Sequence, residues 1–507
     1  MDRYKLLIVV FLALLLRLPA LLLLSMTGDE ISTVYQASFS FRFTLSRLAF
    51  MDVAGGDIAP PLYYIILNRF LALFPFTVWA TRLLSVAFDL VTIIAAYFLV
   101  QQEDTRETAL YSALFIACSP FQIWYGTEIR MYALIPLFTV LSTFSLVKFM
   151  RQGKGIYLLY YWFCATLGMY TQYYFALLIG AHFLVGLWTI QRPKIVPFLG
   201  AFGAIGLSFL PWLKPFFIDL SILKTQSFLV PESSPLAFFY LLVKLFFFGN
   251  RFFVLTYPLI YGGGVLIIVV LFCLYLQKFR SVNPAIKIIS LICIAAIGFL
   301  SIIFLVKPLA LRPHATIFLL PLLLITTAYL TVQARKYGIL LRLSIFIMWG
   351  MILLLYNYNP LFSKPRVQEG AEIIIELNQQ KNPVVNLPLQ IPCPRDIVPG
   401  SFKLWEFYLQ NRCPLFFVQG ETASDLFDSL KRHLNDSPNF ILVYFQHFQP
   451  PVFYTDLIKK IEGEFRAVNK IVLESKVDTF PIVIIFYEKI KAEQHHRSGQ
   501  STAGKVK

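Results

Sequence analysis

The chain has 507 residues, of which 58% are hydrophobic and only 14% are charged, and its mean hydropathy is +0.68. A soluble domain is about half apolar and about a quarter charged, so this composition excludes an ordinary soluble protein and indicates a polytopic membrane protein. The net charge of +16 does not require a nucleic-acid partner, because Lys and Arg in short loops orient membrane spans and can also hold lipid phosphates.

The first apolar run, from Leu6 to Met26, predicts an uncleaved membrane span. It is too long for the apolar region of a signal peptide, Arg17 interrupts it, and no A-x-A-like cleavage site follows. Asp29 and Glu30 come directly after it, in interfacial water where carboxylates can stay ionised beside lipid. The pair is therefore a candidate base for a lipid-borne substrate, although acidic residues can also simply make a first loop polar.

Further apolar runs bring the expected number of spans to about eleven. The predicted fold class is an α-helical polytopic membrane protein with juxtamembrane helices on its outer face and a small C-terminal α/β domain. The spans are expected near residues 5–26, 78–100, 108–125, 131–149, 156–170, 173–190, 195–213, 252–277, 285–306, 313–332 and 339–356.

Loop charges predict which side of the membrane each segment occupies. With the N-terminus in the cytoplasm, the loops 151–155, 191–194, 277–287 and 333–338 fall inside, and all four are basic. The fifth inner loop, 101–108, is acidic and gives no support. The run 60–74 is short and opens with two prolines, so it is expected to be a helix at the outer interface, as is the run 236–248. Asp29 and everything after residue 358 are then extracytoplasmic.

The tail differs in composition from the rest of the chain and predicts a separate domain. We expect a transmembrane module over 1–358, an extracytoplasmic α/β domain over 359–490 and a disordered end over 491–507. Within the domain, helical spacing predicts a helix at 369–379 and β-rich runs predict strands at 416–418, 440–444, 470–473 and 482–487. Cys393 and Cys413 could form a disulfide if this domain is extracytoplasmic, but the spacing alone leaves the pairing open.

Once the sides are assigned, unexpected cations gather at the outer face. Lys and Arg normally prefer cytoplasmic loops, so cations on the outer side need another explanation. Charged residues beside a membrane span are by default functional candidates, and these suggest an anionic ligand such as a lipid phosphate. Taken singly, each cation could instead have a purely structural role, with its charged group extended to the membrane interface. Asp89 lies inside a span and is expected to pair with a buried cation or polar group, without a catalytic role. The outer cations include Arg42, Arg47, Arg130, Lys214, Lys224, Lys244, Arg251, Lys307 and Arg312, with Arg17 and Arg82 near the outer ends of their spans.

Several short motifs follow one another in a fixed order over about residues 1–330. The chain on this basis resembles the membrane glycosyltransferases of the C superfamily, in the branch of the protein O-mannosyltransferases and the lipid A aminoarabinose transferase. The motifs are Arg17, Asp29-Glu30, Asp57 ahead of Pro60-Pro61-Leu62-Tyr63-Tyr64, Arg82-x-x-Ser85, Glu128-x-Arg130-x-Tyr132, and Arg312 ahead of Pro321.

The resemblance implies an inverting glycosyltransferase that moves a sugar from a polyprenyl-phosphate donor to a lipid, glycan or protein acceptor at the outer face of the plasma (inner) membrane. It implies Asp29 as general base, with Glu30 orienting the site and Asp57 binding the acceptor. Arg130, Lys307 and Arg312 are the candidates for the donor phosphate, supported by Arg82, Glu128 and Tyr132. No cofactor is expected. Ala59 stands where relatives often have His, so we also expect no required metal.

Three other functions stay open. A transporter or flippase of lipid-linked sugars would share a cationic outer groove, but we find no internal repeat of the kind such proteins show. A non-catalytic scaffold could bind cell-envelope polymers through the tail. An oligosaccharide ligase with a diphosphate-linked donor would rely on outer arginines, but an Asp-Glu pair after the first span is not its expected signature.

Overall fold

The computed structural model divides the chain into two compact units. One comprises residues 1–24, 32–52 and 56–362, and the other comprises residues 25–31, 53–55 and 363–507. The structure describes residues 2–50, 59–74, 76–225, 243, 246, 258–306, 313–358, 367–378, 382–386, 405, 408–409, 412–417, 423–434, 437–445, 452–473 and 482–490.

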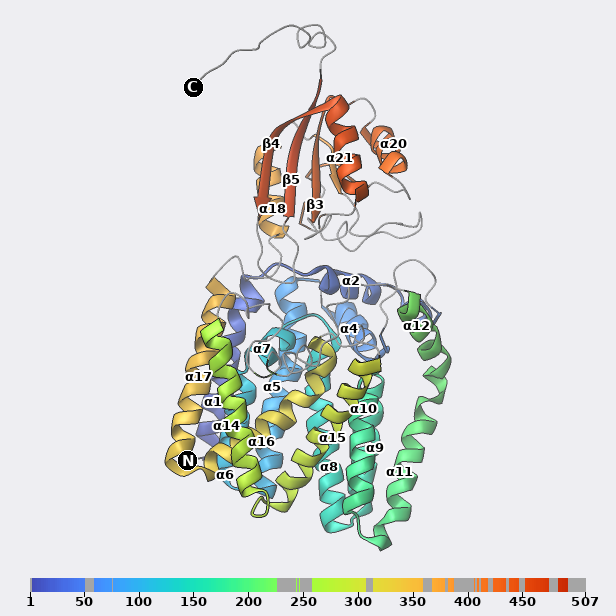
Figure 1. Cartoon of the computed structure of the whole chain (residues 1–507). Helices are drawn as coiled ribbons and strands as arrows, with labels where there is room; N and C mark the ends of the chain where they lie inside the picture. The colour runs from blue at the N-terminus through green and yellow to red at the C-terminus, as the bar shows by residue number, and fades with distance from the viewer. Residues whose placement is uncertain are drawn as a thin grey trace. The chain divides into compact units, whose positions relative to one another are not determined.

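The described residues up to 358 form helices joined by short connections and no strand, and Figure 1 shows the long helices as a bundle of roughly aligned rods. In chain order the helices are α1 (Asp2–Leu22), α2 (Gly28–Ala37), α3 (Phe41–Phe50), α4 (Leu62–Leu73), α5 (Val78–Glu103), α6 (Arg106–Cys118), α7 (Pro120–Gly126), η1 (Met131–Ala133), α8 (Leu134–Gln152), α9 (Gly155–Met169), α10 (Phe175–Thr189), η2 (Arg192–Lys194), α11 (Ile195–Phe209), η3 (Leu210–Trp212), α12 (Leu213–Thr225), α14 (Pro258–Lys278), α15 (Pro284–Val306), η6 (Pro313–Leu319), α16 (Leu320–Gln333) and α17 (Arg335–Tyr358).

Wherever the structure describes a predicted span, most of it is helical, and residues 252–257 of one span lie outside the described residues. Seven helices among the described residues are long and apolar enough to cross a membrane. The predicted span 108–125 is not one continuous helix. It breaks at Ser119, whose side chain caps α7, and Pro120 occupies the first turn of α7. The spans predicted at 156–170 and 173–190 correspond to α9 and α10, which have 15 residues each.

The bundle is held by close packing between helices that are neighbours in the fold. α5 packs against α1, α6 and α8, and α16 packs against α6. A second cluster joins α8, α9 and α11 through Phe149, Tyr161, Phe198 and Ile205, all buried. Where two helices approach closely, a glycine makes room: a Cβ on Gly186 of α10 would lie 2.3 Å from the Phe198 ring of α11.

The run expected to form an interfacial helix at 60–74 is indeed a helix, α4, whereas the run 236–248 lies almost entirely outside the described residues.

The C-terminal unit contains a five-stranded mixed sheet of order β2-β1-β3-β5-β4. β1 pairs in parallel with β2 and β3, while β5 pairs antiparallel with both β3 and β4. Its elements are α18 (Val367–Leu377), β1 (Val384–Asn386), β2 (Leu415–Phe417), α20 (Ala423–Leu434), β3 (Asn439–Phe445), α21 (Val452–Glu464), β4 (Phe465–Leu473) and β5 (Ile482–Lys489).

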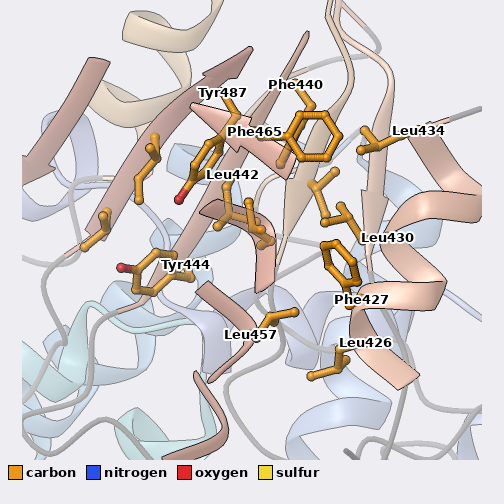
Figure 2. Close-up of a cluster of buried hydrophobic side chains, with 14 residues drawn as sticks. Leu426, Phe427, Leu430, Leu434, Phe440, Leu442, Tyr444, Leu457, Phe465 and Tyr487 are labelled. Carbon is orange, nitrogen blue, oxygen red and sulfur yellow. The ribbon is translucent and has the colours of Figure 1, made fainter. Parts of the chain in front are cut away.

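Helices cover both faces of this sheet. On one face, α20 and α21 bury Leu430 and Ile461 against Leu442 and Ile485, and Figure 2 shows the rings of Phe440, Phe465 and Tyr487 in the same cluster. On the other face, Gly370 of α18 lies close to Leu473 and Ile484; a Cβ there would be 3.4 Å from the Cδ1 atoms of both. The alternation of side chains along β5 explains why both faces are apolar.

The predicted α/β character of the tail is confirmed, and four of its strands lie at or next to the expected positions. β1, α20 and α21 were not predicted from the sequence. Cys413 is a buried free thiol that accepts a hydrogen bond from the Asn378 amide (3.5 Å), so it does not form the disulfide considered above. Cys393 and the expected disordered end at 491–507 lie outside the described residues.

Candidate active site

Asp29 and Glu30 stand in the first turn of α2, and local hydrogen bonds explain why the helix begins there. The Glu30 carboxylate accepts from the Thr27 backbone N–H (2.8 Å), and the Thr27 hydroxyl accepts from the Glu30 N–H (3.1 Å). This reciprocal pair is a capping box. Glu30 is fully buried, whereas Asp29 is exposed. Of the two predicted carboxylates, Asp29 is thus the one that faces solvent, at a helix N-terminus that favours negative charge.

Arg130 reaches α2 from a distant part of the sequence. It belongs to the short turn between α7 and η1, in which the Arg130 N–H donates to the Glu128 carbonyl (2.8 Å). Its Nη1 donates to the hydroxyls of Thr33 (2.8 Å) and Tyr64 (3.5 Å). The residue is 8% exposed. Thr33 lies four residues after Asp29, so the two side chains occupy the same face of α2.

A cluster of aromatic rings begins beside the Arg130 side chain. The guanidinium carbon lies 5.8 Å from the centre of the Tyr132 ring, and Tyr132 stacks on His314 with 5.0 Å between ring centres and 30° between planes. Tyr125 meets Tyr132 edge to face at 5.0 Å. The cluster combines a guanidinium with hydroxyls and flat rings, which suits binding of an anion that carries an apolar or sugar group.

His314 also lies in the candidate site, although the sequence motifs did not include it. It is the second residue of η6, directly after Pro313, and is half-buried; its carbonyl accepts from the Gln172 amide (3.5 Å). The available signal was its position two residues after Arg312, in the segment predicted to hold the donor phosphate.

Arg82 is fully buried and holds the end of α1. Its Nη1 donates to the carbonyls of Ala20 (2.7 Å) and Leu24 (2.6 Å). A cation at the carboxyl end of a helix is electrostatically favourable, because carbonyls there lack intrahelical partners. One turn later on α5, the Ser85 hydroxyl hydrogen-bonds the Tyr63 hydroxyl (2.8 Å), so two of the predicted motifs meet directly.

Arg17 and Asp89 form a buried ion pair inside the bundle, as expected for Asp89. The Gln122 amide donates to the other Asp89 oxygen, and Arg17 also donates to the Ala117 carbonyl (2.9 Å). Gly126 passes close to this pair, since a Cβ at this position would lie 2.7 Å from Asp89 Cγ. Arg17 therefore has a partner within the bundle and does not extend its head group to the interface.

The structure places six of the nine predicted site residues: Asp29, Glu30, Arg82, Glu128, Arg130 and Tyr132. Glu128 is 7% exposed, in the turn that presents Arg130. Asp57, Lys307 and Arg312 lie outside the described residues. Within the described part of the chain, no three His, Cys, Asp or Glu side chains are grouped so as to hold a metal ion.

A comparison with protein-family models matches residues 59–213 to the dolichyl-phosphate-mannose-protein mannosyltransferases. A search of curated protein sequences finds no significant match.

Solved structures match over nearly the whole chain. ArnT from Cupriavidus metallidurans in its apo state is 15% identical with a TM-score of 0.55, over 94% of this chain and 97% of that chain. The same protein bound to undecaprenyl phosphate is 14% identical with a TM-score of 0.51, over 95% and 97%. The archaeal oligosaccharyltransferase AglB from Archaeoglobus fulgidus, in complex with an inhibitory peptide and a dolichol-phosphate, is 10% identical with a TM-score of 0.50, over 88% and 69%.

At these identities the structural matches establish the fold. The chain is an integral membrane protein with the fold of these membrane glycosyltransferases, and the resemblance expected from the sequence is confirmed by both the family model and the solved structures.

Proposed function

We propose that the chain is an inverting glycosyltransferase that transfers a sugar from a polyprenyl-phosphate donor to a lipid, glycan or protein acceptor. The transferase class follows from the family match and from a fold shared with glycosyltransferases. The observation that carries the mechanism is the placement of Arg130 against Thr33 of α2, one helical turn from the exposed carboxylate Asp29. One of the solved relatives binds undecaprenyl phosphate and another binds a dolichol-phosphate, which supports a lipid-phosphate donor here.

The proposed reaction is a single displacement. Asp29 takes the proton from the acceptor hydroxyl, and the acceptor oxygen forms a bond to the anomeric carbon. The bond between that carbon and the phosphate oxygen breaks on the opposite side, so the configuration inverts. The polyprenyl phosphate leaves with the bonding electron pair, and Arg130 stabilises its charge by donating hydrogen bonds.

The remaining predicted residues take supporting parts in this proposal. Glu30 fixes the first turn of α2 and thereby orients Asp29. Arg82 holds the end of α1 just before that turn. Tyr132, stacked on His314, flanks Arg130, and the Glu128 carbonyl fixes the turn that presents it. Lys307 and Arg312 remain candidates for the donor phosphate, and Asp57 remains a candidate for the acceptor.

We place this chemistry at the extracytoplasmic face of the plasma membrane. The basic loops α8–α9 and α10–α11 support that orientation, since the positive-inside rule assigns them to the cytoplasm. A lipid-linked donor fits the same side, because nucleotide sugars are cytoplasmic.

The test is a transfer assay in proteoliposomes that contain the full chain and a polyprenyl phosphate carrying a radiolabelled sugar, supplied with envelope extract as acceptor. The proposal predicts free polyprenyl phosphate and labelled acceptor, with the anomeric configuration inverted relative to the donor. A flippase would instead move the intact glycolipid between leaflets and leave the label on the lipid. Label that stays on the lipid with every extract would refute the transferase. Mass spectrometry of the extract before and after transfer identifies the acceptor.

A further inference from the structure

A hollow of about 380 Å³ lies in the C-terminal unit at the end of α18, within the usual range of small-ligand sites (about 300–1,000 Å³). Three asparagines and one glutamate line it together with five apolar or aromatic residues. The polar residues are Asn382, Asn439, Asn469 and Glu488, and Leu377 and Phe486 are among the apolar ones.

The strand register explains how these side chains reach one face of the sheet. Asn439 of β3 pairs with Glu488 of β5, and Asn469 of β4 pairs with Phe486 of β5. Phe486 and Glu488 are two residues apart, so both project to the same face, and their paired asparagines project with them. This is the face on which α18 packs, because Ile484 lies against Gly370.

A β-bulge is what brings Asn469 to this face. Ala467 pairs with Tyr487 but Asn469 pairs with Phe486, so Val468 is the extra residue. In a regular ladder Asn469 would oppose Ile485, on the face covered by α20 and α21. Bulges often redirect a side chain next to a functional site. The asparagines of β3 and β4 are then about 12 Å apart, two strand spacings across and two residues along, which suits an elongated ligand.

The polar groups of the hollow have unused hydrogen-bonding capacity. Asn439, Asn469 and Glu488 form no side-chain hydrogen bond or ion pair with another residue of the described chain. Each amide can both donate and accept, which is the pattern that hydroxyl groups require. The half-buried ring of Phe486 adds an apolar surface beside them.

The charges of the lining narrow the class of ligand. Neither Lys nor Arg lines the hollow, and Glu488 would repel a phosphate or carboxylate. A single carboxylate is a poor ligand set for a metal ion, and the asparagines and Glu488 would gain no hydrogen-bond partner from the side chains of a purely hydrophobic peptide.

We propose that this hollow binds a neutral oligosaccharide and holds a glycan portion of the acceptor during transfer. The role in transfer rests on the proposed function, whereas binding of the sugar does not depend on it.

The test uses the full chain in lipid nanodiscs, because glucoside and maltoside detergents would themselves compete. Mannotriose, cellotriose and chitotriose are titrated by saturation-transfer NMR and calorimetry. We expect at least one of them to bind. Asn439→Ala combined with Asn469→Ala should weaken its binding about tenfold or more. Glu488→Gln, which keeps the shape of the side chain, should also weaken it. Lys470→Ala, an exposed β4 substitution outside the lining, is the control and should leave binding unchanged.

Release of sugar from the lipid donor is measured in the same samples. If the chain transfers sugar but binds none of the three probes, the oligosaccharide site is refuted and the proposed function stands. If a probe binds and the asparagine variants weaken it while the donor is never used, the site stands and the proposed function falls. Equal binding by wild type and all variants, or displacement of the sugar by an unglycosylated peptide, also refutes the site.

Discussion

Arg130 combines a nearly buried guanidinium with two hydroxyl partners, and the shape of its head group determines how well it can hold a phosphate. A guanidinium presents several donors in a fixed fork, so it can bind Thr33 and Tyr64 and still direct N–H groups at an anion. A lysine would keep the charge but lose this geometry.

Arg130→Lys should therefore raise the KM for the lipid donor by about 10- to 100-fold, corresponding to the loss of one or two charge-assisted hydrogen bonds. Steady-state kinetics in proteoliposomes measures this change. Arg432→Lys on the exposed side of α20 is the matched control and should behave as wild type. An unchanged KM in Arg130→Lys would remove Arg130 from the donor site.

Gly126 is the residue whose replacement should disturb the buried ion pair most directly. A Cβ at this position would overlap Asp89, which already binds Arg17 and Gln122. Gly126→Ala should therefore cost about 1–3 kcal/mol, as overpacking of a filled interior usually does. Thermal unfolding of the purified protein measures it. Gly200→Ala on α11, where a Cβ meets no atom within 4 Å, should leave the melting temperature unchanged or raise it. Equal melting temperatures for the two variants would contradict this account.

At the scale of elements, α2 matters most because its first turn carries the proposed base. The sequence Thr27-Gly28-Asp29-Glu30 follows the capping-box pattern, and the hydrogen bonds of Thr27 and Glu30 realise it. The local sequence thus fixes where α2 begins, and with it the position of Asp29.

Thr27→Ala removes the cap and should destabilise the start of α2 by about 1 kcal/mol. Since Asp29 would then be less well ordered, we expect kcat to fall several-fold with little change in the KM for the donor. Thr27→Ser keeps the hydroxyl and should retain most of the activity. Steady-state transfer kinetics of the two variants test this prediction. An equal loss of kcat in both would mean that the cap does not orient Asp29.

Some helices could be predicted from local sequence and others could not. Long apolar runs such as 131–149 and 313–332 predicted helices correctly, because helices are the main way for a single segment to satisfy its backbone within lipid. The break at Ser119 was missed, although a cap followed by proline was visible there. α20 was also missed, although Leu426, Leu430 and Leu434 repeat at helical spacing.

For the whole molecule, the sequence predicted the membrane class and the C-superfamily fold, but not which distant residues meet. Thr33 and Arg130 are 97 positions apart, and Tyr63 and Ser85 are 22 apart. Their contacts depend on how helices pack, and a single sequence without aligned relatives carries no direct record of that. The motifs could be identified and ordered, but their convergence had to come from the fold.

The proposed orientation makes a prediction about accessibility. In a cysteine-free background, Ser38→Cys should react with a membrane-impermeant maleimide added to intact cells, because residue 38 is exposed near the end of α2. Lys154→Cys, exposed in the basic loop between α8 and α9, should react only after the cells are lysed. Labelling of both positions from the same side would contradict the assigned topology.

The most direct measurement of the central claim is the rate at which Asp29→Asn transfers sugar from the polyprenyl-phosphate donor. The substitution preserves size but removes the base, so kcat should fall by about 10²–10⁴-fold while the protein stays folded. Asp428→Asn, on the exposed face of α20, is the matched control and should retain full activity. If Asp29→Asn transfers sugar as fast as Asp428→Asn, Asp29 is not the general base and the proposed mechanism is wrong.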